Sequence, residues 1–272
     1  FKQKTAYEML RSLVGSEMCI RDSIYTSHGV SFLRKDISKF KHKQFVYLEK
    51  VATKLFGGKV IACSKSEAEE FRKYGINANY IYNGIDCNFV DSSVENRNIF
   101  TIGTVGRITY QKNPQLFNEI AKEFESNNNI KFLWIGDGKL RNLLTANNIE
   151  VTGWVSKFKV LNYLEQLDLY ISTSLWEGLP LSVLQAMYAR KPLILRKCIG
   201  NVDLVINNYN GFLFEKKRES VELIKTLLNS RQFLRRLGNN SLELVKEKFT
   251  KKIMLDKYLI LYNKVVQNRC KK

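Results

Sequence analysis

The sequence has few of the residues that mark several common protein classes. Among 272 residues there are only 3 prolines and 15 glycines, which excludes a collagen-like repeat or a Pro/Gly-rich linker. No apolar run reaches the roughly 18 residues that a membrane-spanning helix needs. The 5 cysteines are odd in number and form no C-x-x-C pair, so we expect reduced thiols rather than a disulfide framework. What remains is a globular chain with one large domain or two smaller ones.

Acidic residues are also few relative to basic ones. The chain has 44 Lys and Arg against 26 Asp and Glu, a formal net charge of +18. Such an excess favours an anionic membrane surface, a phosphorylated ligand or nucleic acid as a partner. Codon bias in an AT-rich gene is the alternative explanation for most of the lysines. The basic residues are not interleaved with aromatic ones in any recognisable nucleic-acid module, so we expect no nucleic-acid partner.

The first 23 residues do not look native. Residues 2–8 (KQKTAYE) and 13–22 (LVGSEMCIRD) resemble in-frame translations of the adaptors used in short-read sequencing. Such a segment is set aside in the same way as an expression tag. We therefore expect native sequence to begin near residue 24, with the start of a domain missing upstream.

From residue 99 onward, strand-like and helix-like runs alternate. Strands are expected at 99–105, 131–136, 149–154, 168–174, 192–197 and 211–215, with helices at 114–126, 138–147, 157–167 and 180–190. This alternation with short connections predicts a parallel, doubly wound α/β sheet. After residue 219 the pattern is helical to the end, with an interruption expected at 238–240.

Residues 24–90 resemble the tail of a second α/β unit. Strands are expected at 24–27, 59–64 and 79–83, and helices at 39–55 and 65–74. The polar stretch 91–98 is the expected linker. The chain is thus predicted to hold a partial domain at 24–90 and a complete one at 99–272.

A pair of cations follows the first strand of the larger unit. Arg107 comes directly after strand 99–105, and Lys112 lies five residues further on. Ligands of open α/β sheets bind outside the carboxyl ends of strands, where both side chains would face the crevice. Arg offers a fork of donors to phosphate oxygens and Lys a point charge. A solvated loop in a Lys-rich protein is the alternative.

Glu177 and Gly178 lie between strand 168–174 and a helix opened by Pro180. The free N–H groups at a helix N-terminus bind anions, so a phosphate is expected there. The Glu177 carboxylate would repel phosphate but accept hydrogen bonds from sugar hydroxyls. Gln185 lies eight residues further on, on a similar helix face. The alternative for Glu177 is a carboxylate that favours the helix dipole.

The two histidines differ in setting. His28 follows strand 24–27 directly, where it could take part in hydrogen bonding or proton transfer near neutral pH, although a lone His is more often structural. His42 is expected on a solvated helix face. The sequence has no H-E-x-x-H, G-x-S-x-G or Walker-type motif, and the turn at 136–138 lacks the third Gly of a dinucleotide fingerprint. Metal, serine-hydrolase, P-loop and dinucleotide chemistry therefore have no support.

Taken in order, several stretches resemble glycosyltransferase family 4, the retaining enzymes with the GT-B fold. The stretches are 64–86, 105–114 (VGRITYQKNP), 132–141 (FLWIGDGKLR), 151–154 (VTGW) and, most specifically, 172–194 (STSLWEGLPLSVLQAMYARKPLI). The resemblance implies two Rossmann-like domains. It also implies transfer of a sugar from a nucleotide sugar, with UDP as the first expectation, to a glycan or lipid-linked acceptor in bacterial surface polysaccharide synthesis.

The resemblance further implies residue roles. Arg107 and Lys112 would bind the donor diphosphate, and Glu177 would be the first Glu of the Glu-x7-Glu motif, close to the donor sugar. One departure is Gln185, which stands where the family has the second Glu, the expected partner of the ribose hydroxyls. The full expected set is catalytic His28 and Glu177, with donor-binding Arg107, Lys112, Gly178, Leu181, Ser182 and Gln185.

The same resemblance sets the expected surroundings of the site. No metal and no cofactor is required, because the cations and the helix N-terminus can offset the diphosphate charge. The expected location is the cytoplasm, at the inner face of the plasma membrane. The chain itself is expected to be inactive because half of the cleft is missing. The alternative function is a non-catalytic GT-B-like module that binds a nucleotide or glycan.

Overall fold

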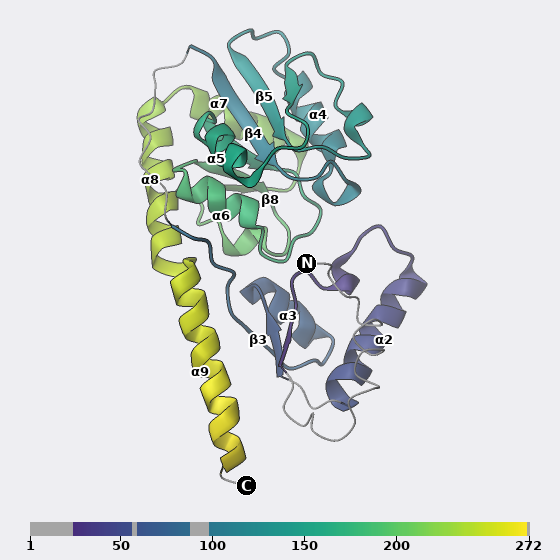
Figure 1. Cartoon of the computed structure of the whole chain (residues 1–272). Coiled ribbons are helices and arrows are strands. Elements are labelled where there is room, and N and C mark those ends of the chain that lie inside the picture. Colours follow the sequence, from purple (N-terminus) through teal and green to yellow (C-terminus); the bar gives the residue numbers. More distant parts are fainter. Residues whose placement is uncertain (1–23, 56–58, 88–97, 271–272) are drawn as a thin grey trace.

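The computed structural model describes residues 24–55, 59–87 and 98–270. The segment 1–23, with its expected adaptor origin, and nearly all of the expected linker 91–98 lie outside the described residues. The chain forms two lobes, which face each other and are flanked by the C-terminal helices, α8 (Arg231–Lys248) beside one lobe and α9 (Lys251–Cys270) beside the other (Figure 1). We name them the N-lobe (residues 24–87) and the C-lobe (residues 98–250).

The C-lobe is built on a six-stranded, all-parallel sheet. Its strands are β4 (Phe100–Val105), β5 (Ile130–Ile135), β6 (Ile149–Val151), β7 (Leu169–Ser172), β8 (Leu193–Arg196) and β9 (Gly211–Phe214). They lie in the order β6-β5-β4-β7-β8-β9. This is the doubly wound order, in which the chain reverses direction across the sheet between β4 and β7. The predicted fold class is confirmed.

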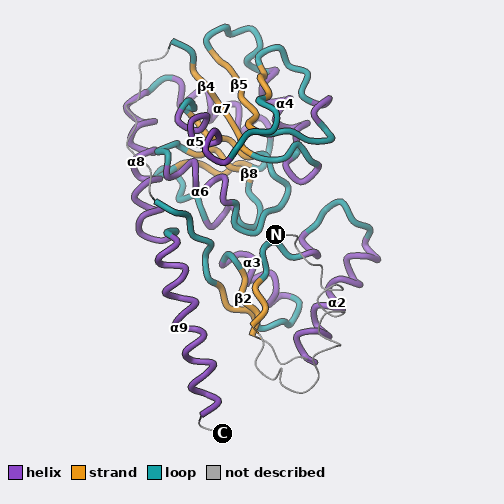
Figure 2. Tube along the Cα trace, viewed as in Figure 1, coloured by secondary structure: helices purple, strands orange, loops and turns teal. Residues whose placement is uncertain are grey.

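Helices cover both faces of this sheet, as the tube in Figure 2 shows. They are α4 (Pro114–Lys122), α5 (Lys157–Glu165), α6 (Leu181–Tyr188), α7 (Lys217–Leu228) and α8 (Arg231–Lys248), with short 3-10 turns η2 (Tyr110–Lys112), η3 (Arg141–Leu143) and η4 (Asn201–Asp203). Successive residues of β5 point to opposite faces: Phe132 packs in the core shared with α4 and α7, and Leu133 in the core shared with α5 and α6. Strands buried on both faces explain the nearly continuous apolar runs of the sequence.

Two helix predictions for the C-lobe were wrong. The expected helix 138–147 is only the short η3 turn. A Cβ on Gly138 would lie 2.4 Å from the Ile108 carbonyl oxygen, and that oxygen also accepts a hydrogen bond from the Leu140 N–H at 3.3 Å. The segment is thus held against the loop after β4 instead of coiling.

The interruption expected at 238–240 is also absent, because α8 runs through it. A Cβ on Gly238 would lie 2.1 Å from the Arg190 carbonyl oxygen, so this glycine permits close helix packing rather than a break. The break comes later, at Phe249 and Thr250. There Ile85 of the N-lobe donates to the Phe249 carbonyl at 2.9 Å and accepts from the Lys251 N–H at 2.9 Å.

The N-lobe carries a parallel sheet of three strands in the order β1-β2-β3. Its elements are β1 (Ile24–Thr26), η1 (Ser31–Leu33), α2 (Lys39–Leu55), β2 (Lys59–Ala62), α3 (Lys65–Lys73) and β3 (Ala78–Tyr80). The start of α3 follows from its sequence, because the Ser64 side chain caps it by accepting from the Glu67 N–H.

The carboxyl ends of the two sheets meet where the lobes touch. Asp203 of the C-lobe accepts hydrogen bonds from the backbone N–H groups of Lys65 and Ser66 at the start of α3, at 3.0 and 3.2 Å. The Asn83 amide donates to the Leu179 carbonyl at 3.3 Å. These contacts bring the loops that follow β2 and β3 against those that follow β8 and β7, and the candidate site lies there.

Candidate active site

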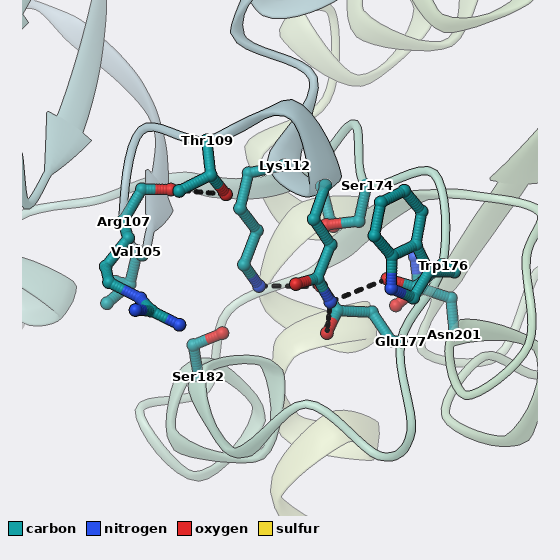
Figure 3. A network of polar contacts seen from close by, with 12 residues as sticks. Val105, Arg107, Thr109, Lys112, Ser174, Trp176, Glu177, Ser182 and Asn201 are labelled. Atoms are coloured by element: carbon teal, nitrogen blue, oxygen red, sulfur yellow. Dashed lines mark hydrogen bonds and ion pairs between the residues drawn. The ribbon is translucent and has the colours of Figure 1, made fainter. Parts of the chain in front are cut away.

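A buried ion pair marks the C-lobe side of the site. The Lys112 Nζ lies 2.6 Å from the Glu177 Oε1, and the two side chains are only 19% and 8% exposed. Lys112 ends η2, after β4, and Glu177 follows β7, so the pair joins the two strands at which the sheet reverses direction (Figure 3). The sequence predicted both residues at this crevice but not that they bind each other.

Backbone contacts fix the two loops that carry the pair. The Gln111 side chain donates to the Trp176 carbonyl at 2.9 Å, and the Gln111 carbonyl accepts from the Leu175 N–H at 2.8 Å. The Thr173 hydroxyl donates to the Lys112 carbonyl at 2.7 Å. Each loop is therefore tied to the other on both sides of the ion pair, which leaves the two charged groups little freedom.

The ion pair holds Lys112 in its charged form. Burial by itself would lower the pKa of Lys112, but the charge of Glu177, the nearby Tyr170 and the hydrogen bond to Glu177 act against burial and raise the pKa overall. The ammonium thus stays positive, and its charge is balanced by the carboxylate while no ligand is bound.

Arg107 supplies the uncompensated charge of the site. Its side chain is exposed, and among the described residues its guanidinium makes no ion pair. Figure 3 shows it opposite Ser182, on the first turn of α6. The Ser182 hydroxyl accepts from the Tyr170 hydroxyl at 3.2 Å, and the Tyr170 oxygen accepts from the Val105 N–H at 3.4 Å. Tyr170 thus ties the end of β4 to the start of α6.

The start of α6 is an uncapped helix N-terminus. It begins at Leu181 after the extended Pro180, and no described side chain caps it. Leu181 is 50% exposed and Ser182 is partly exposed, so the first turn is open to a ligand. Gln185 lies one turn further along the same helix and is partly exposed. Free N–H groups at a helix start, here beside Arg107 and Lys112, are suited to receive an anion.

The N-lobe closes against Gly178. A Cβ there would lie 2.8 Å from the Cys63 Sγ and 2.9 Å from the Gly29 N, so only glycine fits this contact. Gly29 has φ +103°, a conformation that glycine adopts readily. His28, exposed and adjacent to Gly29, is therefore brought to the turn that carries Glu177. Of the predicted site residues, Glu177, Gly178 and His28 are thus brought to this meeting of the lobes.

Sequence reasoning missed two carboxylates at the same place, the partly buried Asp203 and the buried Glu67. Asp203 binds the start of α3 from the other lobe, and burial raises its pKa. Nothing in the sequence around Asp203 indicates this contact. Glu67 is fully buried beneath the His28 loop, and it had a signal in Ser64-x-x-Glu67, the pattern of a helix capping box.

The described part of the chain lacks two features, a cluster of metal ligands and a membrane-spanning helix. Among these residues, no group of three or more His, Cys, Asp and Glu side chains is placed to hold a metal ion. Within the same residues, no helix combines the length and the apolar character needed to cross a bilayer.

The family model that matches this chain is described as glycosyl transferases group 1, and it covers residues 88–243. A UDP-Gal:alpha-D-GlcNAc-diphosphoundecaprenol alpha-1,3-galactosyltransferase of Escherichia coli is 38% identical over 44% of this chain and 33% of its own length. A poly(ribitol-phosphate) alpha-N-acetylglucosaminyltransferase of Staphylococcus aureus is 27% identical over 60% of this chain and 35% of its own length. The chain thus spans about a third of each of these two relatives.

Solved structures share the fold. Anabaena HepE in complex with UDP has a TM-score of 0.79 at 19% identity, over 95% of this chain and 77% of that one. Staphylococcus aureus TarM in complex with UDP and alpha-GlcNAc-glycerol has a TM-score of 0.74 at 21% identity, over 88% of this chain and 50% of that one. The GT-B architecture predicted from the sequence is confirmed by these matches.

Proposed function

The chain belongs to the glycosyl transferases group 1 family, and from that premise we propose that its site binds a nucleotide-sugar donor, UDP-linked in the first instance. The whole protein would transfer the sugar, with retention at the anomeric carbon, to a glycan or lipid-linked acceptor in bacterial polysaccharide synthesis. The observation that carries the proposal is the Lys112–Glu177 pair beside Arg107 and the uncapped start of α6. The UDP complex of HepE supports the choice of donor.

Each group in the site has a part in this reaction. Arg107, Lys112 and the α6 N–H groups would receive the diphosphate and stabilise the charge that grows on it as the bond to the sugar breaks. Glu177, which already binds Lys112, would accept from sugar hydroxyls with its other oxygen. His28 would face the sugar from the N-lobe, and Gln185 would bind the ribose.

Calorimetric titration of the full chain with UDP, GDP and ADP tests the donor site. We expect saturable binding of UDP, weakened about ten- to 150-fold in Arg107→Ala, because a hydrogen bond to a charged group contributes about 1.5–3 kcal/mol. Arg235→Ala is the matched control, since Arg235 is an exposed arginine on α8. Absence of UDP binding, or equal loss in both variants, would contradict the donor site.

The alternative, a non-catalytic nucleotide- or glycan-binding module, is favoured by one observation, the uncharged Gln185 at the expected ribose position. Both functions predict nucleotide binding, but only the transferase releases UDP from a UDP-sugar when an acceptor is added. Binding of UDP-sugars without acceptor-dependent UDP release by the intact parent protein would favour the alternative.

We propose in addition that the protein works at an anionic membrane surface on the cytoplasmic side, with α2 as the contact. Phe40 and Tyr47 are 70% and 67% exposed on α2. At 100° per residue they share one helix face with Lys39, Lys43, Lys50 and Lys54, all exposed. The single acidic residue of α2, Glu49, is buried and bonded to the Tyr25 hydroxyl. Basic and aromatic side chains on one face are typical of helices that lie at a lipid surface.

Sedimentation with vesicles containing anionic lipid tests this contact. Changing the four lysines of that face to Gln should abolish binding, since each basic residue contributes about 1 kcal/mol near such a surface. The matched control changes four exposed lysines of C-lobe helices, Lys122, Lys225, Lys246 and Lys248. Equal loss in both variants would mean that only net charge matters, and binding to neutral vesicles would count against the proposal as well.

A further inference from the structure

The Glu67 carboxylate is the centre of a hydrogen-bond cluster that the donor site does not use directly. Glu67 is fully buried, and no ion pair reaches it among the described residues. Five donors converge on it: the Ser27 hydroxyl at 2.9 Å and the N–H groups of Gly29 and Val30 at 3.0 Å bind Oε1, and the Cys63 N–H at 2.9 Å and thiol at 3.1 Å bind Oε2.

This arrangement departs from an ordinary helix cap. In a capping box the Glu at the third helical position turns back to the N–H of the cap residue. Here Ser64 caps α3 by accepting from the Glu67 N–H at 3.1 Å, but the carboxylate reaches past it to Cys63 and to the loop after β1. One side chain therefore joins the first turn of α3, the end of β2 and the end of β1.

The groups that Glu67 holds are those that meet the C-lobe. Gly29 and Cys63 are the two residues that a Cβ on Gly178 would touch, at 2.9 Å from the Gly29 N and 2.8 Å from the Cys63 Sγ. Gly178 directly follows Glu177, and His28 lies between two of the residues bound to Glu67. The Glu67 cluster is thus the support of the N-lobe wall of the site.

All five partners are donors, so both oxygens of Glu67 must accept. An ionised carboxylate accepts only, whereas a glutamine would turn an NH2 group toward donors on one side. Burial, followed by the charge of Glu67, raises the pKa of the Cys63 thiol, so the thiol keeps its proton and donates. A change of Glu67 to Gln therefore removes acceptors without changing the volume of the side chain.

We propose that Glu67 is a positioning residue, which holds the loop Ser27–Val30 against the Gly178 turn so that the sugar end of the donor is bound. The proposal rests on the proposed function. It predicts that Glu67 contributes to the difference in affinity between a UDP-sugar and UDP. The affinity for UDP itself should not depend on Glu67, because the diphosphate would bind to C-lobe residues.

The test compares Glu67→Gln with Glu69→Gln, an exposed glutamate on the same helix. In the full chain, amide hydrogen exchange at Gly29, Val30 and Cys63 should be about tenfold faster or more in Glu67→Gln, as expected for loss of a hydrogen bond to a charged acceptor. Calorimetry with UDP, UDP-glucose, UDP-galactose and UDP-N-acetylglucosamine should show unchanged UDP affinity and a loss of most of the sugar-dependent gain. The control should match the wild type in both measurements.

Ser27→Ala removes one hydrogen-bond donor to Glu67 with little change of volume. It should give a smaller loss of the sugar-dependent gain in affinity, and it replaces Glu67→Gln as the test variant if Glu67→Gln does not fold. Unchanged exchange, an unchanged sugar-dependent gain, or an equal loss for UDP and UDP-sugars would overturn the positioning role. A wild-type chain that binds no UDP at all would instead overturn the proposed function on which the role depends.

Discussion

Replacing Glu177 with glutamine would leave the Lys112 ammonium without its carboxylate in a site that is mostly closed to water. The two side chains are 8% and 19% exposed, and their charged atoms lie 2.6 Å apart. Breaking a buried pair by removing one partner costs about 3–5 kcal/mol, chiefly because the other charge stays buried and unpaired. Since Lys112 keeps some contact with water, we expect the lower end, about 3 kcal/mol, for Glu177→Gln.

Chemical and thermal unfolding of a double-mutant cycle measures this. For a lobe of this size, about 3 kcal/mol corresponds to a Tm lower by roughly 6–12 °C. Lys112→Met should cost a similar amount, because among the described residues it leaves the Glu177 carboxylate with only the Gln111 side chain, at 3.4 Å. The double variant buries neither charge, so its loss should be smaller than the sum of the single losses by about 2–3 kcal/mol.

The exposed pair Lys197–Glu215 is the control. Its atoms are 2.7 Å apart, but its side chains are 57% and 60% exposed. Glu215→Gln should therefore change the free energy of unfolding by less than about 1 kcal/mol. Additivity of the two site variants within about 0.5 kcal/mol, or a Glu177→Gln loss no larger than that of the control, would refute the reasoning that burial makes this pair matter.

Three further predictions concern single groups. Gln185→Glu should tighten UDP binding about fivefold, because a charged acceptor strengthens a hydrogen bond to a ribose hydroxyl by about 1 kcal/mol. If calorimetry shows no gain in UDP affinity, residue 185 does not bind the ribose. Burial, then the charge of Glu177, raises the pKa of Cys198 to about 12, so the thiolate fraction at pH 8 is about 10⁻⁴. Alkylation of Cys198 by iodoacetamide, followed by mass spectrometry, should therefore be about a thousandfold slower than that of a free cysteine. A rate near that of free cysteine would contradict this. Burial raises the pKa of Asp203. The contribution of this raised pKa to stability is therefore complete below the ordinary carboxyl pKa and is lost as pH rises through the raised value. The wild type should lose stability relative to Asp203→Asn as pH rises above about 4, and parallel urea midpoints of the two proteins across that range would be the contrary result.

The fold was predictable because its signals are local. Alternating apolar runs and helix-like runs are enough to indicate a parallel α/β sheet, and the predicted helix starts at residues 114 and 65 agree with those of α4 and α3, which Asn113 and Ser64 cap. The failures came at glycines. Gly138 and Gly238 lie in the two segments that were predicted wrongly, and each must be glycine because a carbonyl from a distant segment lies where a Cβ would be. No local sequence pattern indicates that a distant carbonyl lies so close to a glycine.

The candidate site divides in the same way. Arg107, Lys112 and Glu177 were predictable because strand ends in a doubly wound sheet all open on one edge, and a charged residue placed there faces the crevice whatever the packing elsewhere. That Lys112 and Glu177 pair at 2.6 Å depends on how the loops after β4 and β7 are tied together by Gln111 and Thr173. The hydrophobic periodicity of the sequence does not indicate such contacts between residues about 65 positions apart.

The sequence by itself determined the class of sheet, the edge at which the site lies and the residue types that face it, because these follow from short-range periodicity and from the polarity of parallel strands. Only the tertiary structure decided which charges are balanced, that Asp203 of one lobe caps α3 of the other, and that Glu67 supports the wall opposite Gly178. The physical reason is that hydrogen bonds and ion pairs depend on distances of about 3 Å, and those distances are set by how distant segments pack.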